Sequence, residues 1–516
     1  MLCIIEVKVP TPIKDNCRPM LRKINTQLLV AFFTVFLVTW HFSVVRLPSC
    51  SEQSSVALQA PESENVAFEQ WKIPNWVERF NVTHLFDWTW HKNGEFIRCR
   101  AHINRSSHLS ACKAASATVV NDVLDYFRSH PDEGCIVDNV IRLPNLIPHP
   151  LPLARSLTDT CSSLHINHEW AICIQPQSEL NNLLPATKRF VTIAVFNAFV
   201  DTGYCHPQVP GTVFTERATF HLQRWTNKRC SNDVISNIPQ IKNEYRHTEL
   251  IDSIGNYLEA PGHFAPQQLP RLLRLLATAP TTAKVLVAKG GVADSLIDVL
   301  IERGIVTRDR IIQFDKDIRP NHFANIVYRS ESWPYVGDKG NSHYIHDRTD
   351  MQLVHRAMAT DDLAAIDKKD CIIVIKRKDG DARSIVEHSD MIAFITSALN
   401  KSKVLSDRHI EIFEAQGHIR DHIALFRRAR IIVGPHGAGM MNILWSSPGT
   451  HVIEIGYTTG MTFPEMYAEM SLHLEHHYWI CKGHGDYYAP IHVDMEDFMY
   501  IFNQIIHEIE IEEGRS

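Results

Sequence analysis

Residues 430–455 read RIIVGPHGAGMMNILWSSPGTHVIEI, the clearest indication of the fold in the chain. Two short β-branched runs, RIIVG (430–434) and HVIEI (451–455), have the length and composition of buried strands. Between them, the glycines of PHGAG predict a tight turn, and residues 440–445 predict the start of a helix. Strand, turn, helix and strand at this spacing form a βαβ unit, whose two strands are parallel.

The alternation continues toward the N-terminus. CIIVIK (371–376) and HIEIF (409–413) predict further strands, and an amphipathic helix follows near residues 419–429. Ser384 with Glu387 predicts a capping box that opens a helix ending near Leu399. Alternating strands and helices over this length predict a doubly wound parallel sheet.

An earlier block repeats the pattern. KVLVAK (284–289) predicts a strand, a helix ended by Gly304 follows, and RIIQF (310–314) predicts the next strand. We therefore predict an α/β protein with two Rossmann-like domains facing a cleft, over residues 188–360 and 361–490. The acidic helix within 491–516 is expected to pack back on them.

The N-terminus predicts a membrane anchor. Residues 28–45 contain no Asp, Glu, Lys or Arg, and basic residues precede them. Such a run spans a bilayer with the basic side in the cytoplasm. We predict a cytoplasmic tail (1–23), a transmembrane signal anchor (24–46) and a flexible stem (47–70). A cleavable signal peptide and a buried core helix are the alternatives.

The cysteines and sequons agree with a lumenal location. Of 12 cysteines, most lie in the first half of the chain, and no CxxC pair with matching His spacing indicates zinc. Some disulfides are therefore expected, with their pairing open, and residues 71–187 are predicted to form a cysteine-containing accessory region. Asn81, Asn104 and Asn400 occupy glycosylation sequons. The net charge of −6 gives no basic field for nucleic acid.

The turn at 434–442 has the chemistry of an anion site. Gly437 and Gly439 let the backbone approach a ligand, and the following helix start offers unpaired N–H groups. His436 adds a hydrogen-bonding group. A tight turn whose glycines only permit the geometry is the simpler alternative. The position of the turn, after a strand, favours a ligand site over this alternative, because open α/β sheets bind ligands at the carboxyl ends of strands.

Three charged residues extend this site. Glu454 lies inside a strand that should be buried, so it needs a partner, either a structural donor or the hydroxyls of a ribose. Arg377 and Arg383 flank the strand-end loop KRKDGDAR, and guanidinium groups suit diphosphate oxygens. Lys376 and Lys378 are better interpreted as part of a solvated turn.

At these residues the chain resembles glycosyltransferase family 61. That family includes plant core β-1,2-xylosyltransferases, xylan arabinosyl- and xylosyltransferases, and animal O-linked N-acetylglucosaminyltransferases. The resemblance spans about residues 245–477. It is carried by VGPHGAGMMNILWSSPGTHVIEI (433–455), and supported by GHFAPQQLPRLLRL (262–275), IIVIKRKDGDARSIVEH (372–388) and FEAQGHIRDHIALFRRARIIVG (413–434).

The resemblance implies a GT-B arrangement and inverting transfer from a nucleotide sugar, usually UDP-linked, by a hexosyl- or pentosyltransferase. Residues 188–360 would then bind the acceptor, a glycan or glycoprotein, and 361–490 the donor. The implied setting is the membrane of the Golgi or endoplasmic reticulum. By position in the motif, the donor-site candidates are His436, Gly437, Gly439, Asn442 and Glu454, with Arg377 and Arg383 as diphosphate contacts. Glu387 departs from the Asn that relatives often have there.

An inverting displacement needs a base for the acceptor hydroxyl, and His263 is the candidate because GHF precedes a helix. The alternative for His263 is a capping or packing role. Two DxD patterns, at 315–317 and 379–381, raise the alternative of a Mn²⁺ site. Arginines and a helix terminus already supply positive charge, so we predict no metal ligands and no required cofactor.

The sequence thus predicts a type II membrane glycosyltransferase of the secretory pathway. The first alternative is a catalytically inactive lumenal protein that binds nucleotides or glycans and retains the fold. A lumenal hydrolase is the second alternative, but no GxSxG or similar signature supports it.

Overall fold

The computed structural model describes the chain in segments, and the longest segments contain the predicted βα pattern. The described residues are 118–120, 126–127, 129–130, 132–137, 189–202, 212–215, 217–220, 243–254, 264–314, 320–333, 348–358, 369–461, 463 and 466–514. Outside them lie the predicted tail (1–23), anchor (24–46) and stem (47–70), together with Asn81, Asn104 and His263. Within the described segments, no helix has both the length and the apolar character that crossing a membrane requires.

The C-terminal half forms a five-stranded parallel sheet in the order β11-β10-β12-β13-β14, counted over the described residues. Its strands are β10 (Cys371–Ile375), β11 (His409–Phe413), β12 (Ala429–Pro435), β13 (His451–Ile455) and β14 (His477–Cys481). Every residue of β10, β12 and β13 is buried, so both faces of the sheet are covered. The predicted parallel sheet is confirmed here.

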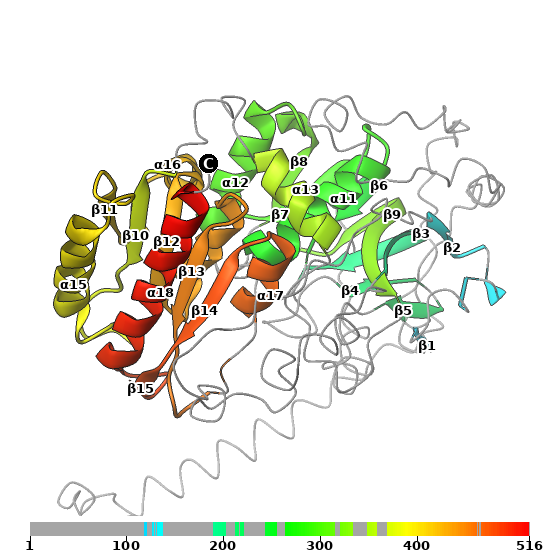
Figure 1. Cartoon of the computed structure of the whole chain (residues 1–516). Coiled ribbons are helices and arrows are strands. Elements are labelled where there is room, and N and C mark those ends of the chain that lie inside the picture. Colours follow the sequence, from blue (N-terminus) through cyan, green and yellow to red (C-terminus); the bar gives the residue numbers. More distant parts are fainter. Residues whose placement is uncertain are drawn as a thin grey trace, which may run out of the picture. The chain divides into compact units, whose positions relative to one another are not determined.

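Two groups of helices belong to this sheet. In the first, α15 (His388–Lys401) and α18 (Met495–Gly514) pack through Phe394 against Phe498 and Phe502, and Figure 1 shows α18 running along the sheet. The second group is α16 (Ile419–Arg427), the 3₁₀ helix η8 (Ala438–Trp445) and α17 (Met466–His473). A small antiparallel pair, β15 (Gly483–Gly485) and β16 (Ile491–Val493), precedes α18.

The N-terminal sheet is mixed rather than wholly parallel. In its described strands the order is β1-β5-β4-β3-β9-β6-β7-β8, with β2 also paired to β3. The parallel part is β6 (Arg246–Asp252), β7 (Lys284–Ala288), β8 (Ile311–Phe314) and β9 (His322–Trp333). The antiparallel part is built on β3 (Arg189–Asp201), with β2 (Gly134–Val137), β4 (Thr212–Phe214) and β5 (Ala218–Phe220); β1 (Thr118–Val120) is parallel to β5.

The mixture arises from the long pairing of β3 with β9. These strands run antiparallel with partners from Arg189 opposite Trp333 to Val200 opposite His322. The predicted βαβ unit at 284–314 is confirmed as β7, α12 (Gly291–Glu302) and β8. A simple Rossmann-like half therefore describes only the β6–β9 side of this sheet.

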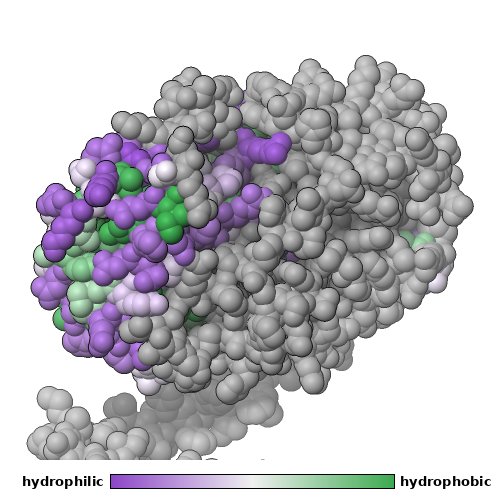
Figure 2. Space-filling view, viewed as in Figure 1, coloured by the Kyte–Doolittle hydropathy of each residue, from purple (hydrophilic) through white to green (hydrophobic). Residues whose placement is uncertain are grey.

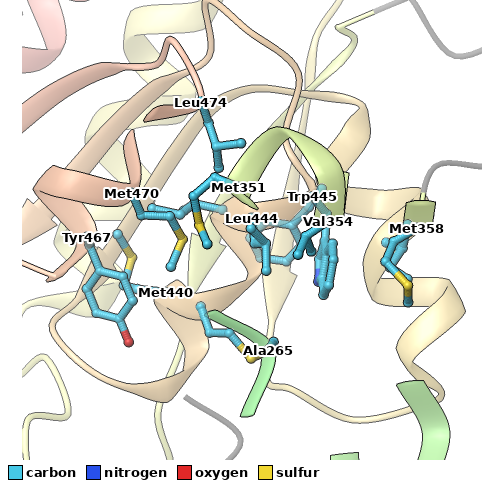
Figure 3. Close-up of a cluster of buried hydrophobic side chains, with 14 of the residues drawn as sticks. Ala265, Met351, Val354, Met358, Met440, Leu444, Trp445, Tyr467, Met470 and Leu474 are labelled. Atoms are coloured by element: carbon cyan, nitrogen blue, oxygen red, sulfur yellow. The ribbon is translucent and has the colours of Figure 1, made fainter. Parts of the chain in front are cut away.

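Helices between the two sheets join them in one apolar core. The connecting elements are the π-helix η6 (Phe264–Gln268), α11 (Leu269–Thr278), α12 and α13 (Arg348–Met358), which contact η8, α16 and α17. Figure 3 shows Met351 and Val354 of α13 beside Leu444 and Trp445 of η8. The 3₁₀ helix that follows HGAG is thus anchored from both sheets.

Two local predictions are wrong. Glu387 does not form a capping box with Ser384, because its carboxylate accepts hydrogen bonds from His492 Nδ1 (2.7 Å) and the Val493 amide (2.8 Å). The helix after HGAG is also a 3₁₀ helix, and it begins at Ala438, two residues earlier than expected. The acidic C-terminal helix α18 packs on β14 and α15 of the C-terminal sheet.

On the face that Figure 2 shows, the described residues are mostly hydrophilic, with smaller hydrophobic areas. Among the described residues, Tyr488 is the most exposed large hydrophobic side chain, at 72%. Cys371 and Cys481 are buried free thiols.

Candidate functional site

The site lies at the carboxyl end of the C-terminal sheet. His436 and Gly437 follow β12, and Arg377 and Arg383 lie in the loop that follows β10. β10 and β12 are adjacent parallel strands, so their carboxyl ends meet at one edge. This is where open α/β sheets bind ligands.

Both arginines reach the turn at residues 434–442, called the glycine turn below. A Cβ built on Gly437 would lie 2.9 Å from Arg377 Nη1 and 3.9 Å from Arg383 Nε and Nη2. Gly437 has φ +151°, a conformation that side chains with a Cβ rarely adopt. The missing side chain therefore leaves room for two guanidinium groups beside the turn.

The arginines keep hydrogen-bonding capacity for a ligand. Within the described residues, Arg377 Nε and Arg383 Nε and Nη1 are buried without a hydrogen-bond partner. Burial, and then the charge of Arg383, lower the pKa of Arg377. Two neighbouring cations with buried, unpaired donors form a site that an anion would stabilise.

Arg383 is held in place from two sides. Its guanidinium lies 3.8 Å from the ring centre of Tyr487, a cation–π contact. Its backbone N–H donates to Ala489 O at 2.6 Å, and its φ of +60° is unusual for a residue with a side chain. The loop before β16 thus fixes an arginine that belongs to the β10 loop.

His436 is bound to a buried carboxylate. Its Nδ1 lies 2.6 Å from Glu454 Oε1, and Glu454 has no exposed surface. The hydroxyl of Tyr478 donates to Glu454 Oε2 at 2.5 Å. Glu454 therefore has the structural partners that its place in β13 required, and it acts on a ligand only through His436.

An aromatic wall encloses the histidine. The rings of Tyr457, Phe463 and Tyr467 lie 6.0, 5.2 and 5.3 Å from the His436 ring centre. Tyr467 donates its hydroxyl to Gly437 O at 2.6 Å. Burial raises the pKa of Tyr457 and of Tyr467, so both hydroxyls are neutral at ordinary pH.

Gly439 and Asn442 have packing roles. A Cβ on Gly439 would lie 2.7 Å from Ile375 Cγ2 in β10. Asn442 Nδ2 donates to Gly439 O (3.0 Å), and Asn442 Oδ1 accepts from Trp445 Nε1 (3.1 Å), so its amide bridges two residues within η8. In the structure these two predicted donor-site residues make packing and hydrogen-bond contacts within the turn and η8.

The predicted base lies outside the described residues, but the next segment is informative. Phe264–Gln268 directly follows His263 and contacts both η8 and α12. The π-helix is a conformation found often at functional sites. This segment therefore belongs to the same region as the glycine turn.

Of the two DxD patterns, only the one at 379–381 lies in the described residues, in the loop that carries both arginines. Asp315 and Asp317 are outside the described residues. Asp379 is 83% exposed and pairs with Lys376 at 3.7 Å in a turn around Gly380. A cluster of His451, His477 and Glu508 lies near the amino ends of β13 and β14, away from the glycine turn. Trp479 Nε1 donates to His451 Nδ1 there, which ties up one possible ligand atom.

Of the predicted glycosylation sites, only Asn400 lies in the described residues, where it is exposed in the last turn of α15.

The sequence reasoning missed Tyr467, Tyr478 and Tyr487. Each contacts its partner across 24 residues or more, as with Tyr478 and Glu454. No short-range pattern encodes such contacts.

Comparison with known proteins finds a match to one family model. The model of the family described as Glycosyltransferase 61 matches residues 261–453. The match begins two residues before His263 and ends one before Glu454, so it includes both arginines and the glycine turn. No curated protein matches the chain.

Proposed function

We propose, from the premise that residues 261–453 of this chain belong to glycosyltransferase family 61, that the protein is an inverting glycosyltransferase. The family match supports glycosyltransferase activity in general, with a nucleotide-sugar donor and a glycan acceptor. We propose a UDP-linked donor, a glycan or glycoprotein acceptor, and hexosyl or pentosyl transfer. The active site lies at the carboxyl end of β10 and β12.

One observation carries this proposal. The guanidinium groups of Arg377 and Arg383 converge on Gly437, and several of their nitrogens are buried without partners in the described structure. A diphosphate between them would satisfy these donors and reduce the repulsion of two like charges. The same positive charge would stabilise the nucleoside diphosphate as it departs.

The reaction is a single displacement. The acceptor hydroxyl attacks the anomeric carbon, and the bond from that carbon to the diphosphate oxygen breaks with its electron pair leaving on the diphosphate. A base takes the hydroxyl proton, and we propose His263 for this role. The segment that follows it contacts η8, which supports a base on this side of the donor.

The two sheets support a GT-B arrangement, in which donor and acceptor bind to different domains. We propose metal-independent transfer, because two arginines already face the diphosphate position. The charge-free run at 28–45 and the three sequons support a type II anchor in the Golgi or endoplasmic reticulum membrane.

Binding and turnover are tested separately. Isothermal titration of the purified full-length protein with UDP should show binding, and Arg383→Gln should weaken it about 10- to 100-fold, as expected for one charge-assisted contact. Lys378→Gln, in the same loop but exposed, should leave the affinity unchanged. Absence of UDP binding would contradict the proposal.

A panel of nucleotide sugars, assayed with and without EDTA, then measures transfer and donor hydrolysis. We expect activity with one donor that survives EDTA and is lost in His263→Ala, which should still bind UDP. Binding of UDP without turnover of any donor would favour the inactive lumenal protein instead.

A further inference from the structure

A chain of hydrogen bonds ends at one nitrogen of His436 and leaves the other for a ligand. Tyr478 donates to Glu454 Oε2, and Glu454 Oε1 lies 2.6 Å from His436 Nδ1. Both carboxylate oxygens are thus occupied, and neither is exposed. His436 Nε2 forms no hydrogen bond to any described residue.

This arrangement fixes the tautomer of the histidine. An ionised carboxylate only accepts hydrogen bonds, so Glu454 requires the proton of a neutral His436 to be on Nδ1. Nε2 then carries a lone pair and is itself an acceptor. A phosphate oxygen is also an acceptor, so a neutral His436 cannot pair with a diphosphate.

Few titratable or charged groups lie around His436. They are Glu454 on β13, Tyr478 on β14, Tyr457 after β13 and Tyr467 on α17, with Arg377 and Arg383 after β10 beside the adjacent Gly437. Burial raises the pKa of all three tyrosines, which are neutral at ordinary pH. Glu454 therefore offsets one of the two arginines, the exposed Asp381 also acts on the charge of Arg377, and a diphosphate would still carry uncompensated negative charge.

We propose that His436 takes up a proton when a nucleoside diphosphate binds, and that its Nε2–H then donates to a phosphate oxygen. Glu454 is the positioning residue, because it holds Nδ1 and leaves Nε2 to donate. This inference rests on the proposed function, since it takes the arginine pair as the diphosphate site. The proton comes from solvent and returns there when the nucleotide leaves, and no bond to the substrate is made or broken by His436.

The consequence is a donor site that is sensitive to pH. Affinity for the nucleotide should rise as pH falls toward neutrality, because protons and ligand bind together. The imidazolium would add a third positive charge where the departing diphosphate develops charge.

Calorimetry counts the protons directly. UDP is titrated into the purified full-length protein at about pH 8, in two buffers with different ionisation enthalpies, and the slope gives protons taken up per UDP. Wild type should take up more protons than His436→Gln, by up to about one per site. At about pH 8 the terminal phosphate of free UDP is almost fully ionised, so it releases few protons on binding to either protein.

Two variants separate the positioning role of Glu454 from the charge of Arg383. Glu454→Gln keeps the side-chain shape, but its amide N–H₂ can donate to Nδ1 and place the histidine proton on Nε2. It should therefore bind UDP with less proton uptake than wild type. Arg383→Gln should bind more weakly with the wild-type proton uptake.

The outcomes are distinct. Equal proton uptake in wild type and in His436→Gln would overturn this inference while UDP binding stands. Should His436→Gln fail to fold, as judged by its thermal unfolding, the comparison of wild type with Glu454→Gln decides in the same way. No UDP binding by wild type would instead contradict the proposed function.

Discussion

At the scale of the residue, Gly437 links backbone conformation to the proposed chemistry. Its φ of +151° turns the chain out of β12, its carbonyl accepts from Tyr467, and its missing Cβ gives Arg377 room. Any side chain here would meet a guanidinium nitrogen at 2.9 Å. Only glycine fulfils all three conditions.

Gly437→Ala should therefore damage the site more than the fold. We expect the added methyl group to displace Arg377 and to weaken UDP binding about 10-fold or more, with backbone strain of about 1–3 kcal/mol. Titration calorimetry and urea unfolding measure the two effects. Gly291→Ala is the matched control, because Gly291 has φ +60° but nothing within 4 Å of its Cβ position. If Gly437→Ala bound UDP with wild-type affinity, the position of Arg377 beside Gly437 would be contradicted.

At the scale of the element, α18 shows how an acidic helix is held on a parallel sheet. Its apolar face is buried through Phe498, Ile501 and Phe502. Its acidic end meets Arg430 of β12, whose Nη2 lies 2.6 Å from Glu512 Oε2 and whose Nη1 donates to Gly449 O at 3.0 Å. The side chain of Arg430 is only 6% exposed, so these partners, rather than water, stabilise its charge.

Arg430→Met should lower the free energy of unfolding by about 1–3 kcal/mol, because it leaves Gly449 O without its donor and Glu512 without its nearest cation. Chemical unfolding measures this. The control is Arg308→Met, whose pair with Asp298 is 64% and 40% exposed and should contribute less than about 1 kcal/mol. If the free energy of unfolding fell equally in the two variants, the buried ion pair of Arg430 would contribute no more to stability than the exposed pair of Arg308.

At the scale of the whole molecule, the layer between the sheets contains histidines that must stay neutral. Burial lowers the pKa of His476 from 6.5 to about 3, and that of His355 on α13 to about 4. His476 Nε2 donates to Ser446 O, at the end of η8 (3.3 Å). Protonation would place charges in the layer that joins the two halves.

The free energy of unfolding should fall as the pH is lowered. Below about pH 6.5 the unfolded chain binds a proton at His476, whereas the folded chain binds it only near pH 3, so acid favours unfolding. At about pH 5 this residue alone should remove about 2 kcal/mol. Urea unfolding at about pH 7.5 and pH 5 tests it.

His476→Gln should show a smaller pH dependence than wild type, since glutamine can still donate to Ser446 O but does not titrate. His484→Gln is the control, because the His484 side chain is 55% exposed. An unchanged pH dependence in His476→Gln would contradict the buried neutral state.

The sequence predicted the elements well where periodicity was strong. Four of the five strands of the C-terminal sheet, β10 to β13, and the unit β7–α12–β8 lie where their apolar runs indicated, because buried parallel strands are recognisable from composition alone. The fifth strand, β14, was not predicted from the sequence. Glu387 shows the opposite case. Its spacing from Ser384 fits a capping box, but its carboxylate bonds to His492 and Val493, over a hundred residues away.

The sequence alone determined the βα order, the glycine turn and the residue types that suit an anion, since these depend on local conformation and side-chain chemistry. Tertiary structure decided which of those residues meet. It brought Arg377 and Arg383 to Gly437, gave Glu454 to His436 and kept Asn442 inside η8. It also added the antiparallel β3 to the N-terminal sheet. Such contacts depend on packing between distant segments, and no local pattern specifies them.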